Sequence, residues 1–140
     1  MNEYTGDSAK NYKQGNQRLI IANPGIERMI PPANDKNSTV LDLACGNGHF
    51  YPHLIDKGYT YTGVDLSSDL IAQAKERFPA GSFHKSDATT VSSLFKQKFD
   101  LILCALLLNV FDSLETIKVV LNQTKALLEP TGQFVVCNVH

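Results

Sequence analysis

The sequence lacks any apolar run long enough to cross a membrane. Its most apolar stretch, residues 99–111, contains Asp100 and Asn109 and falls short of the roughly 20 residues that a membrane-spanning helix needs. Residues 1–7 are polar and lack the apolar core of a secretory signal peptide. We therefore expect a protein that works without contact with a membrane, in the cytoplasm.

The sequence also lacks an excess of charge of one sign. Lysine and arginine number 13 against 14 aspartates and glutamates, and no basic stripe stands out, which argues against tight binding of nucleic acid.

The cysteines are three, an odd number, and all of them, Cys45, Cys104 and Cys137, lie in apolar segments. This pattern indicates reduced, buried thiols in an intracellular protein and not a disulfide framework.

The most informative segment is VLDLACGNGHF, residues 40–50, which joins a strand to a glycine-spaced turn. Thr39 to Leu43 is a short run of β-branched and apolar residues, typical of a strand that is covered on both faces. Gly46 and Gly48 follow, and glycine allows both a positive φ and the close approach of a ligand to the backbone. In a parallel α/β sheet this turn lies at the carboxyl edge, where ligands bind.

Strands and helices alternate along the chain, whose 140 residues suffice for one core. We predict strands at residues 39–43, 60–64, 82–85, 99–104 and 133–139. We predict helices at about 48–57, from Ser67 or Ser68 to 78, and from Ser113 until residues 130–132 break it, with a short helix or turn at 91–95. Ahead of them we expect a polar arm, residues 1–17, and two short helices within 18–30, separated by a turn at 23–25. This alternation implies parallel crossovers and a doubly wound α/β sheet.

The helix after Ser113 carries five apolar residues that we expect to face the core: Leu114, Ile117, Val120, Leu121 and Leu128. The helix before Pro79 has a similar stripe, made of Leu70, Ile71, Ala74 and Phe78. The sequence stops directly after the fifth strand, and a domain rarely ends on an unprotected strand edge. We therefore expect a truncated version of a longer protein, or a partner that covers the edge.

Three aspartates lie at or just after the ends of predicted strands. Asp42 precedes the glycine turn, Asp65 comes 19 residues after Gly46, and Asp87 follows the third strand. Because parallel strands end at one edge of a sheet, we expect all three carboxylates there. A carboxylate after the second strand suits ribose hydroxyls, Asp87 suits an adenine amine, and Asp42 suits an amino or sulfonium group. So many acids favour a cofactor with positive charge over a pyrophosphate.

A dinucleotide site is the first alternative. It needs a third glycine, as in G-x-G-x-x-G, where this chain has Tyr51, and no Gly-Lys-Ser/Thr follows to form a phosphate-binding loop. The glycines by themselves also suit a purely structural turn, and Asp87 suits a turn residue. His49 and His53 lie four residues apart on a predicted helix but lack a third ligand at a set spacing, so we predict no metal site.

Five segments, in consistent order, resemble the motifs of class I S-adenosylmethionine-dependent methyltransferases. VLDLACGNG resembles the first motif, with Ala44 where the family usually has glycine. YTGVDLSSDLIAQAKERF resembles the second motif, and HKSDAT resembles the adenine-binding loop. FDLILCALLLNVF and LLEPTGQFVV resemble the fourth-strand motif and the turn leading into the fifth strand. The resemblance covers residues 38–139 and implies a Rossmann-like, mostly parallel sheet in the order 3-2-1-4-5, with the family's C-terminal hairpin missing.

The resemblance also implies where the cofactor binds, with Asp65 on the ribose and Asp87 in the adenine loop. The implied cofactor-binding set is Asp42, Ala44, Cys45, Gly46, Gly48, Asp65, Leu66, Asp87, Ala88, Cys104, Leu106 and Tyr12. Tyr12 and Tyr4, in the N-terminal arm, are candidates for a lid over the cofactor. No residue is identified as catalytic, and Asn109 is a candidate on the acceptor side.

These observations predict methyl transfer from the cofactor sulfonium to a small-molecule acceptor. Residues 38–140 would form the S-adenosylmethionine-binding domain, and residues 1–37 would form an arm and helices on the acceptor side. Two alternatives stay open: a cofactor-binding module that is inactive without its missing C-terminal part or a partner, and an NAD-type oxidoreductase domain. A protein or RNA acceptor also stays open. The exposed edge of the fifth strand favours a homodimer.

Overall fold

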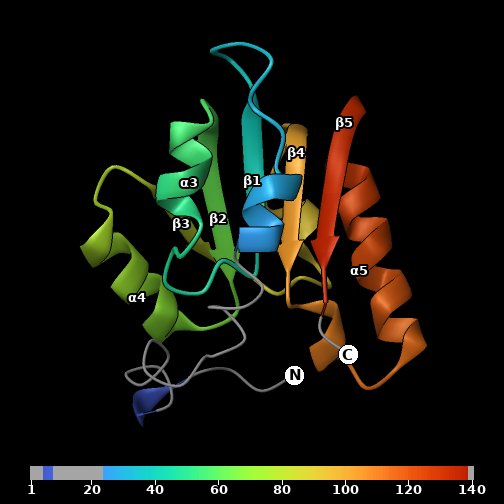
Figure 1. Ribbon diagram of the computed structural model, residues 1–140. Helices are drawn as coiled ribbons and strands as arrows, with labels where there is room; N and C mark the ends of the chain where they lie inside the picture. The colour runs from blue at the N-terminus through green and yellow to red at the C-terminus, as the bar shows by residue number, and fades with distance from the viewer. Residues whose placement is uncertain (1–4, 8–23, 139–140) are drawn as a thin grey trace.

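The protein is built on one five-stranded parallel sheet, seen in a computed structural model that describes residues 5–7 and 24–138 (Figure 1). The strands are β1 (Thr39–Leu43), β2 (Thr60–Asp65), β3 (Ser82–Lys85), β4 (Phe99–Ala105) and β5 (Leu128–Cys137). Their spatial order is β3-β2-β1-β4-β5, and every neighbouring pair is parallel. The predicted sheet order and strand direction are therefore confirmed.

Helices cover the sheet on both faces, which gives three layers (Figure 1). The helices are α3 (Tyr51–Asp56), α4 (Ser68–Arg77) and α5 (Leu114–Leu127), with short 3₁₀ turns η1 (Val91–Ser93) and η2 (Leu108–Val110). A further helix spans residues 24–29 and packs with α3 and α4 on one face, whereas η1 and α5 pack on the other. No helix of the described residues is both long and apolar enough to cross a membrane.

The central strands are apolar almost throughout because both of their faces are buried. Along β1, Val40 packs with the cluster beneath α3 and α4, and the next residue, Leu41, packs with the cluster beneath α5. The same alternation places Leu101 and Ile102 of β4 on opposite faces. This two-sided core fixes the strands whose carboxyl ends carry the predicted site.

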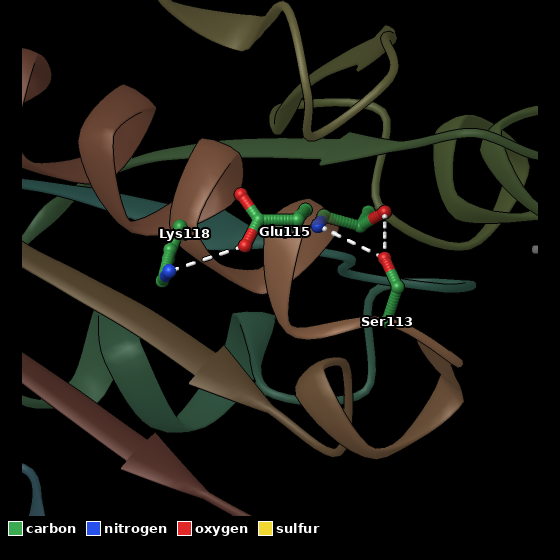
Figure 2. Close-up of polar contacts among 4 residues, drawn as sticks. Ser113, Glu115 and Lys118 are labelled. Carbon is green, nitrogen blue, oxygen red and sulfur yellow. Dashed lines mark hydrogen bonds and ion pairs between the residues drawn. The ribbon is translucent and has the colours of Figure 1, made fainter.

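Serine side chains begin two of the helices, as the sequence predicts. Ser67 accepts a hydrogen bond from the amide of Leu70 at 3.2 Å, and Ser113 accepts one from the amide of Thr116 at 3.2 Å. In α5 the exposed pair Glu115–Lys118 adds an ion pair at 3.1 Å (Figure 2). Each cap satisfies an amide that has no partner within its own helix.

Several element boundaries differ from the prediction. The helix expected from Gly48 begins at Tyr51, because the residues before it form turns, and Pro24 lies inside a helix and not in a turn. Strand β5 begins at Leu128, five residues early. Leu128 pairs with Phe99 and Gln133 pairs with Leu101, so residues 129–132 of β5 bulge opposite the single residue Asp100. The helix expected near residues 18–22 lies outside the described residues.

The predicted inward face of α5 is partly wrong. Leu114 is 73% exposed and Leu121 is 39% exposed, whereas Val120 is fully buried. The buried residues of α5 are Val120, Thr124 and Leu127, a stripe spaced by four and then three residues. Leu114 and Leu121 lie beside this stripe, and Leu128 belongs to β5. Apolar spacing alone did not distinguish the two neighbouring stripes.

The two stripes of α5 can be separated by truncating one leucine on each. Leu127→Ala should lower the free energy of unfolding by about 2–5 kcal/mol, because Leu127 is buried against the sheet. Leu114→Ala, the matched exposed leucine, should change it by less than about 0.5 kcal/mol. Urea denaturation of both variants measures the difference, and equal losses would contradict this assignment of the helix face.

Candidate functional site

The glycine turn after β1 adopts a conformation that most residues avoid. Ala44, Gly46 and Gly48 have φ angles of 63°, 55° and 81°. Left-handed backbone is easy for glycine, but it costs other L-residues roughly 1–2 kcal/mol. Ala44 therefore carries strain at the position where glycine is usual in the resembled motif. The sequence predicted positive φ for the two glycines but not for Ala44.

Two hydrogen bonds join this turn to the end of β2. The amide of Cys45 donates to the carbonyl of Val64 at 2.9 Å, and the amide of Gly46 donates to Oδ2 of Asp65 at 2.8 Å. The other carboxylate oxygen of Asp65, Oδ1, accepts from the amide of Ser67 at 2.9 Å. Both oxygens of a half-buried carboxylate are thus oriented by backbone donors at the carboxyl edge of the sheet.

Asp87 occupies the loop after β3, at the same edge. Its Oδ1 accepts from both the amide and the hydroxyl of Thr89, at 2.9 and 2.8 Å. This arrangement is an Asx-type turn, the structural alternative considered for this residue. Ala88, the next residue, is buried in the core cluster beneath α5. Asp87 therefore shapes its loop, and its carboxylate is half-buried at the edge.

Asp42 is enclosed, unlike the other two acids. Its side chain is 1% exposed, and Oδ2 accepts a hydrogen bond from the hydroxyl of Tyr61 at 2.8 Å. The pKa of Asp42 is raised to about 7 in all: burial is the largest cause, the hydrogen bond from Tyr61 acts against it, and the charge of Asp65 adds to it. Asp42 is the last residue but one of β1 and its charge interacts with that of Asp65, so it lies near the carboxyl edge with its carboxyl enclosed on the face that α3 and α4 cover.

Two cysteines of the predicted set are buried. Cys45 is 4% exposed and Cys104 is fully buried, so the side chain of Cys104 packs in the core beneath α5. Burial raises the pKa of Cys45 well above its ordinary value and that of Cys104 to about 12. Both thiols therefore stay protonated at neutral pH, which suits packing and not nucleophilic chemistry.

Leu106, the residue directly after β4, has a second strained backbone. Its φ is 61°, and its amide donates to the carbonyl of Cys137 in β5 at 2.7 Å. Leu106 and Leu66 are half-buried at the carboxyl edge, while Asn109 is exposed in η2. Residues held in sparsely populated backbone conformations cluster at functional sites. Tyr4 and Tyr12, the predicted lid residues, lie outside the described residues.

Sequence reasoning missed the support that α4 gives to the turn. Asn47 is 2% exposed, and Nη1 of Arg77 donates to its backbone carbonyl at 2.9 Å and to its side-chain Oδ1 at 2.8 Å. A Cβ on Gly48 would lie 3.0 Å from the ring of Phe78, so only glycine fits there easily. An asparagine between two glycines was the available signal, but nothing in the sequence linked it to an arginine 30 residues away.

The two histidines near the turn have separate surroundings. Burial and the charge of Arg77 lower the pKa of His49, while Nδ1 of His53 lies 3.9 Å from the carboxylate of Glu27. Across residues 5–7 and 24–138, no group of three or more His, Cys, Asp or Glu side chains is arranged to hold a metal ion.

Comparison with known proteins gives one family for most of the chain. A family model described as a methyltransferase domain matches residues 34–140. The methyltransferase-family protein YqeM of Bacillus subtilis is 30% identical over 76% of this chain and 43% of its own length. The dTDP-3-amino-3,6-dideoxy-alpha-D-glucopyranose N,N-dimethyltransferase of Streptomyces fradiae is 35% identical over 56% of this chain and 30% of its own. Bovine 18S rRNA (guanine-N(7))-methyltransferase is 30% identical over 56% and 29%.

Solved structures share the fold. The PH0226 protein of Pyrococcus horikoshii matches 95% of this chain and 60% of its own, with a TM-score of 0.71 and 29% identity. The protein in the DhpI-SAM-HEP complex matches 95% of this chain and 61% of its own, with a TM-score of 0.77 and 23% identity. The chain spans less than half the length of the curated relatives that it matches.

The strain at Ala44 can be measured by removing it. Ala44→Gly should raise the free energy of unfolding by about 0.5–1 kcal/mol, because glycine adopts φ 63° without a Cβ penalty and loses only part of this gain to chain entropy. Ala72→Gly, on the exposed side of α4, should instead lower it by about 1 kcal/mol. Thermal and urea unfolding measure whether the free energy of unfolding rises in Ala44→Gly and falls in Ala72→Gly. Destabilisation by Ala44→Gly would show that the turn is not strained.

Proposed function

The chain belongs to the methyltransferase domain family, in the class I S-adenosylmethionine-dependent group, and we propose that it transfers the methyl group of this cofactor to a small-molecule acceptor. The observation that carries the proposal is the bond from the amide of Gly46 to the carboxylate of Asp65. It brings a left-handed glycine turn and an oriented acid together at the carboxyl edge, where α/β sheets bind ligands.

The residues at this edge fit a nucleoside with a cationic tail. Asp65 presents an oriented carboxylate to ribose hydroxyls, and we assign the adenine to the loop of Asp87 and Ala88, with Leu66 beside it. The backbone groups of the turn from Ala44 to Gly48 are available to contact the methionine moiety of the cofactor. Asp65 and Asp87 at this edge, with Asp42 enclosed beside them, suit a sulfonium better than a pyrophosphate; a lysine close by, Lys85, lies opposite Asp65 in the pairing of β2 with β3 and donates to the hydroxyl of Ser68 at 3.0 Å. This fit disfavours an NAD-type dehydrogenase.

The chain's own residues contribute position and surroundings to the reaction. When bound, S-adenosylmethionine supplies an electrophilic methyl group on a positively charged sulfur. The strained turn and Leu106 fix the backbone on which the cofactor would lie, so the geometry needs no reorganisation during transfer. We assign no general base, and Asn109 is our candidate for contact with the acceptor.

A small molecule is the acceptor that the charge of the chain favours. Basic residues, 13 in number, do not exceed the 14 acidic ones, whereas nucleic-acid binding needs a basic surface. The Streptomyces fradiae relative is named for an amino sugar, and the bovine relative is named for rRNA. We propose that residues 1–37 contribute the acceptor side and residues 38–140 the cofactor side. Methyl-transfer assays with amino sugars, small acids and rRNA fragments discriminate among these acceptors.

We also propose a reducing compartment and self-association. Cys45, Cys104 and Cys137 are free thiols, which is typical of cytoplasmic proteins.

Strand β5 lies at one end of the described sheet, and strand edges offer unpaired backbone groups to a second copy. Sedimentation velocity would show a dimer if two copies pair in this way, and a monomer at high concentration would exclude it.

Cofactor binding should depend on Asp65 and not on a similar acid at the opposite edge. Asp65→Asn should weaken binding of S-adenosylhomocysteine by about tenfold or more, because hydrogen bonds to a charged acceptor contribute roughly 1.5–3 kcal/mol. Isothermal titration calorimetry measures the change directly.

Asp100 supplies the matched control. It is also half-buried, and it accepts a backbone amide, that of Thr39 at 2.8 Å, but it lies where β4 begins. Asp100→Asn should leave the affinity for S-adenosylhomocysteine unchanged even if it lowers stability. Equal weakening by both variants, or tighter binding of NAD than of S-adenosylhomocysteine, would overturn the proposed function.

A further inference from the structure

A buried polar cluster lies beneath the glycine turn, and its central residue, Tyr61, is outside the predicted binding set. Tyr61 is 4% exposed in β2, and its hydroxyl donates to Oδ2 of Asp42 at 2.8 Å. Asp42 is opposite Gly63 in the pairing of β1 with β2, so the tyrosine reaches it from the neighbouring strand. A buried carboxyl with one hydroxyl donor depends strongly on that donor.

The surrounding residues hold the tyrosine hydroxyl in place. A Cβ on Gly63 would lie 2.6 Å from the Tyr61 hydroxyl and 2.9 Å from Sγ of Cys45, so these two groups fill the space that glycine leaves. The ring of Tyr61 packs against Tyr51 and Phe83, with centroids 5.0 and 5.3 Å away. The hydroxyl is therefore fixed by packing on several sides and points at the carboxyl.

The charges around Asp42 come from few groups. Burial and the charge of Asp65 raise the pKa of Asp42, whereas the Tyr61 hydroxyl lowers it. The nearby thiols, Cys45 and Cys104, are themselves held protonated by burial.

Two charged groups on the helices of this face, Arg77 and Glu27, have other partners. Arg77 of α4 donates a hydrogen bond to Asn47, and the charge of Arg77 also lowers the pKa of the neighbouring His49. Glu27, in the helix over residues 24–29, lies against His53 of α3. Tyr61 is thus the group that supports the ionised form of Asp42.

We propose that Tyr61 is a positioning residue for cofactor binding, whose hydroxyl keeps the Asp42 carboxyl ionised beneath the turn so that its charge attracts the cationic tail of S-adenosylmethionine. This inference rests on the proposed function. The charges of Asp42 and Asp65 interact, so the buried charge acts on the edge where Asp65 lies. A cation bound there favours the ionised carboxyl, and by linkage its affinity rises as the pH rises through the pKa of Asp42.

The pH dependence of S-adenosylmethionine binding tests the inference. Calorimetric titrations between about pH 5.5 and 8.5 should show affinity rising to a plateau in the wild-type chain. In Tyr61→Phe the midpoint should move upward by about one pH unit, because a hydrogen bond that favours the ionised carboxyl is lost. The ligand's own titration is common to all variants and cancels in the comparison.

Tyr59, the residue directly before the same strand, gives a matched control. It is 6% exposed, and its hydroxyl donates to the carbonyl of Pro31 at 3.0 Å, far along the strand from the turn. Tyr59→Phe should leave the midpoint unchanged. Asp42→Asn should abolish the pH step, and persistence of the step in that variant would overturn the inference.

A second readout does not require a ligand. A carbon-13 titration of the Asp42 carboxyl by NMR should show a higher pKa in Tyr61→Phe than in the wild type or Tyr59→Phe. An unchanged midpoint with uniformly weaker binding would mean that Tyr61 acts only in packing, and the inference would be wrong. If the wild-type chain fails to bind S-adenosylmethionine at every pH, the proposed function fails, and the carboxyl titration still shows whether Tyr61 controls Asp42.

Discussion

The bond between the Gly46 amide and the Asp65 carboxylate is the constraint on which the rest of the site depends. It joins the turn after β1 to the end of β2, beside a backbone bond from Cys45 to Val64. Parallel strands leave their carboxyl ends at one edge, but they do not by themselves fix the loops there. This pair of bonds fixes the loops, so the turn and the acid form one rigid unit.

Packing elsewhere in the sheet offsets the cost of the strained backbone at the carboxyl edge. Ala44 and Leu106 both have left-handed backbone, and they directly follow the neighbouring strands β1 and β4. Those strands are buried on both faces, so packing in the core fixes the positions of their carboxyl ends and of the residues that follow them. Arg77 adds a further anchor by holding Asn47 from α4. A site built on such anchors is preorganised and does not rely on its ligand for its shape.

The three acids of the predicted site divide into two environments. Asp65 and Asp87 are half-buried at the edge and are oriented by local donors, whereas Asp42 is enclosed and relies on Tyr61. An enclosed carboxyl with a pKa of about 7 contributes a charge that depends on pH near neutrality. The electrostatic character of the edge is therefore set partly by a carboxyl that is enclosed by the protein. Family membership alone would not have revealed this division.

The sequence by itself determined the order of elements and the serine caps, at Ser67 or Ser68 and at Ser113, because these follow from short-range patterns, whereas the sheet order came from the resemblance to a known family. Only the tertiary structure decided the buried stripe of α5, the bulge in β5, the enclosure of Asp42 and the contact of Arg77 with Asn47. Each of these depends on which side chains from distant segments compete for the same space. A sequence pattern indicates which residues are apolar and where a strand ends, but it does not indicate which residues from distant segments will pack against them.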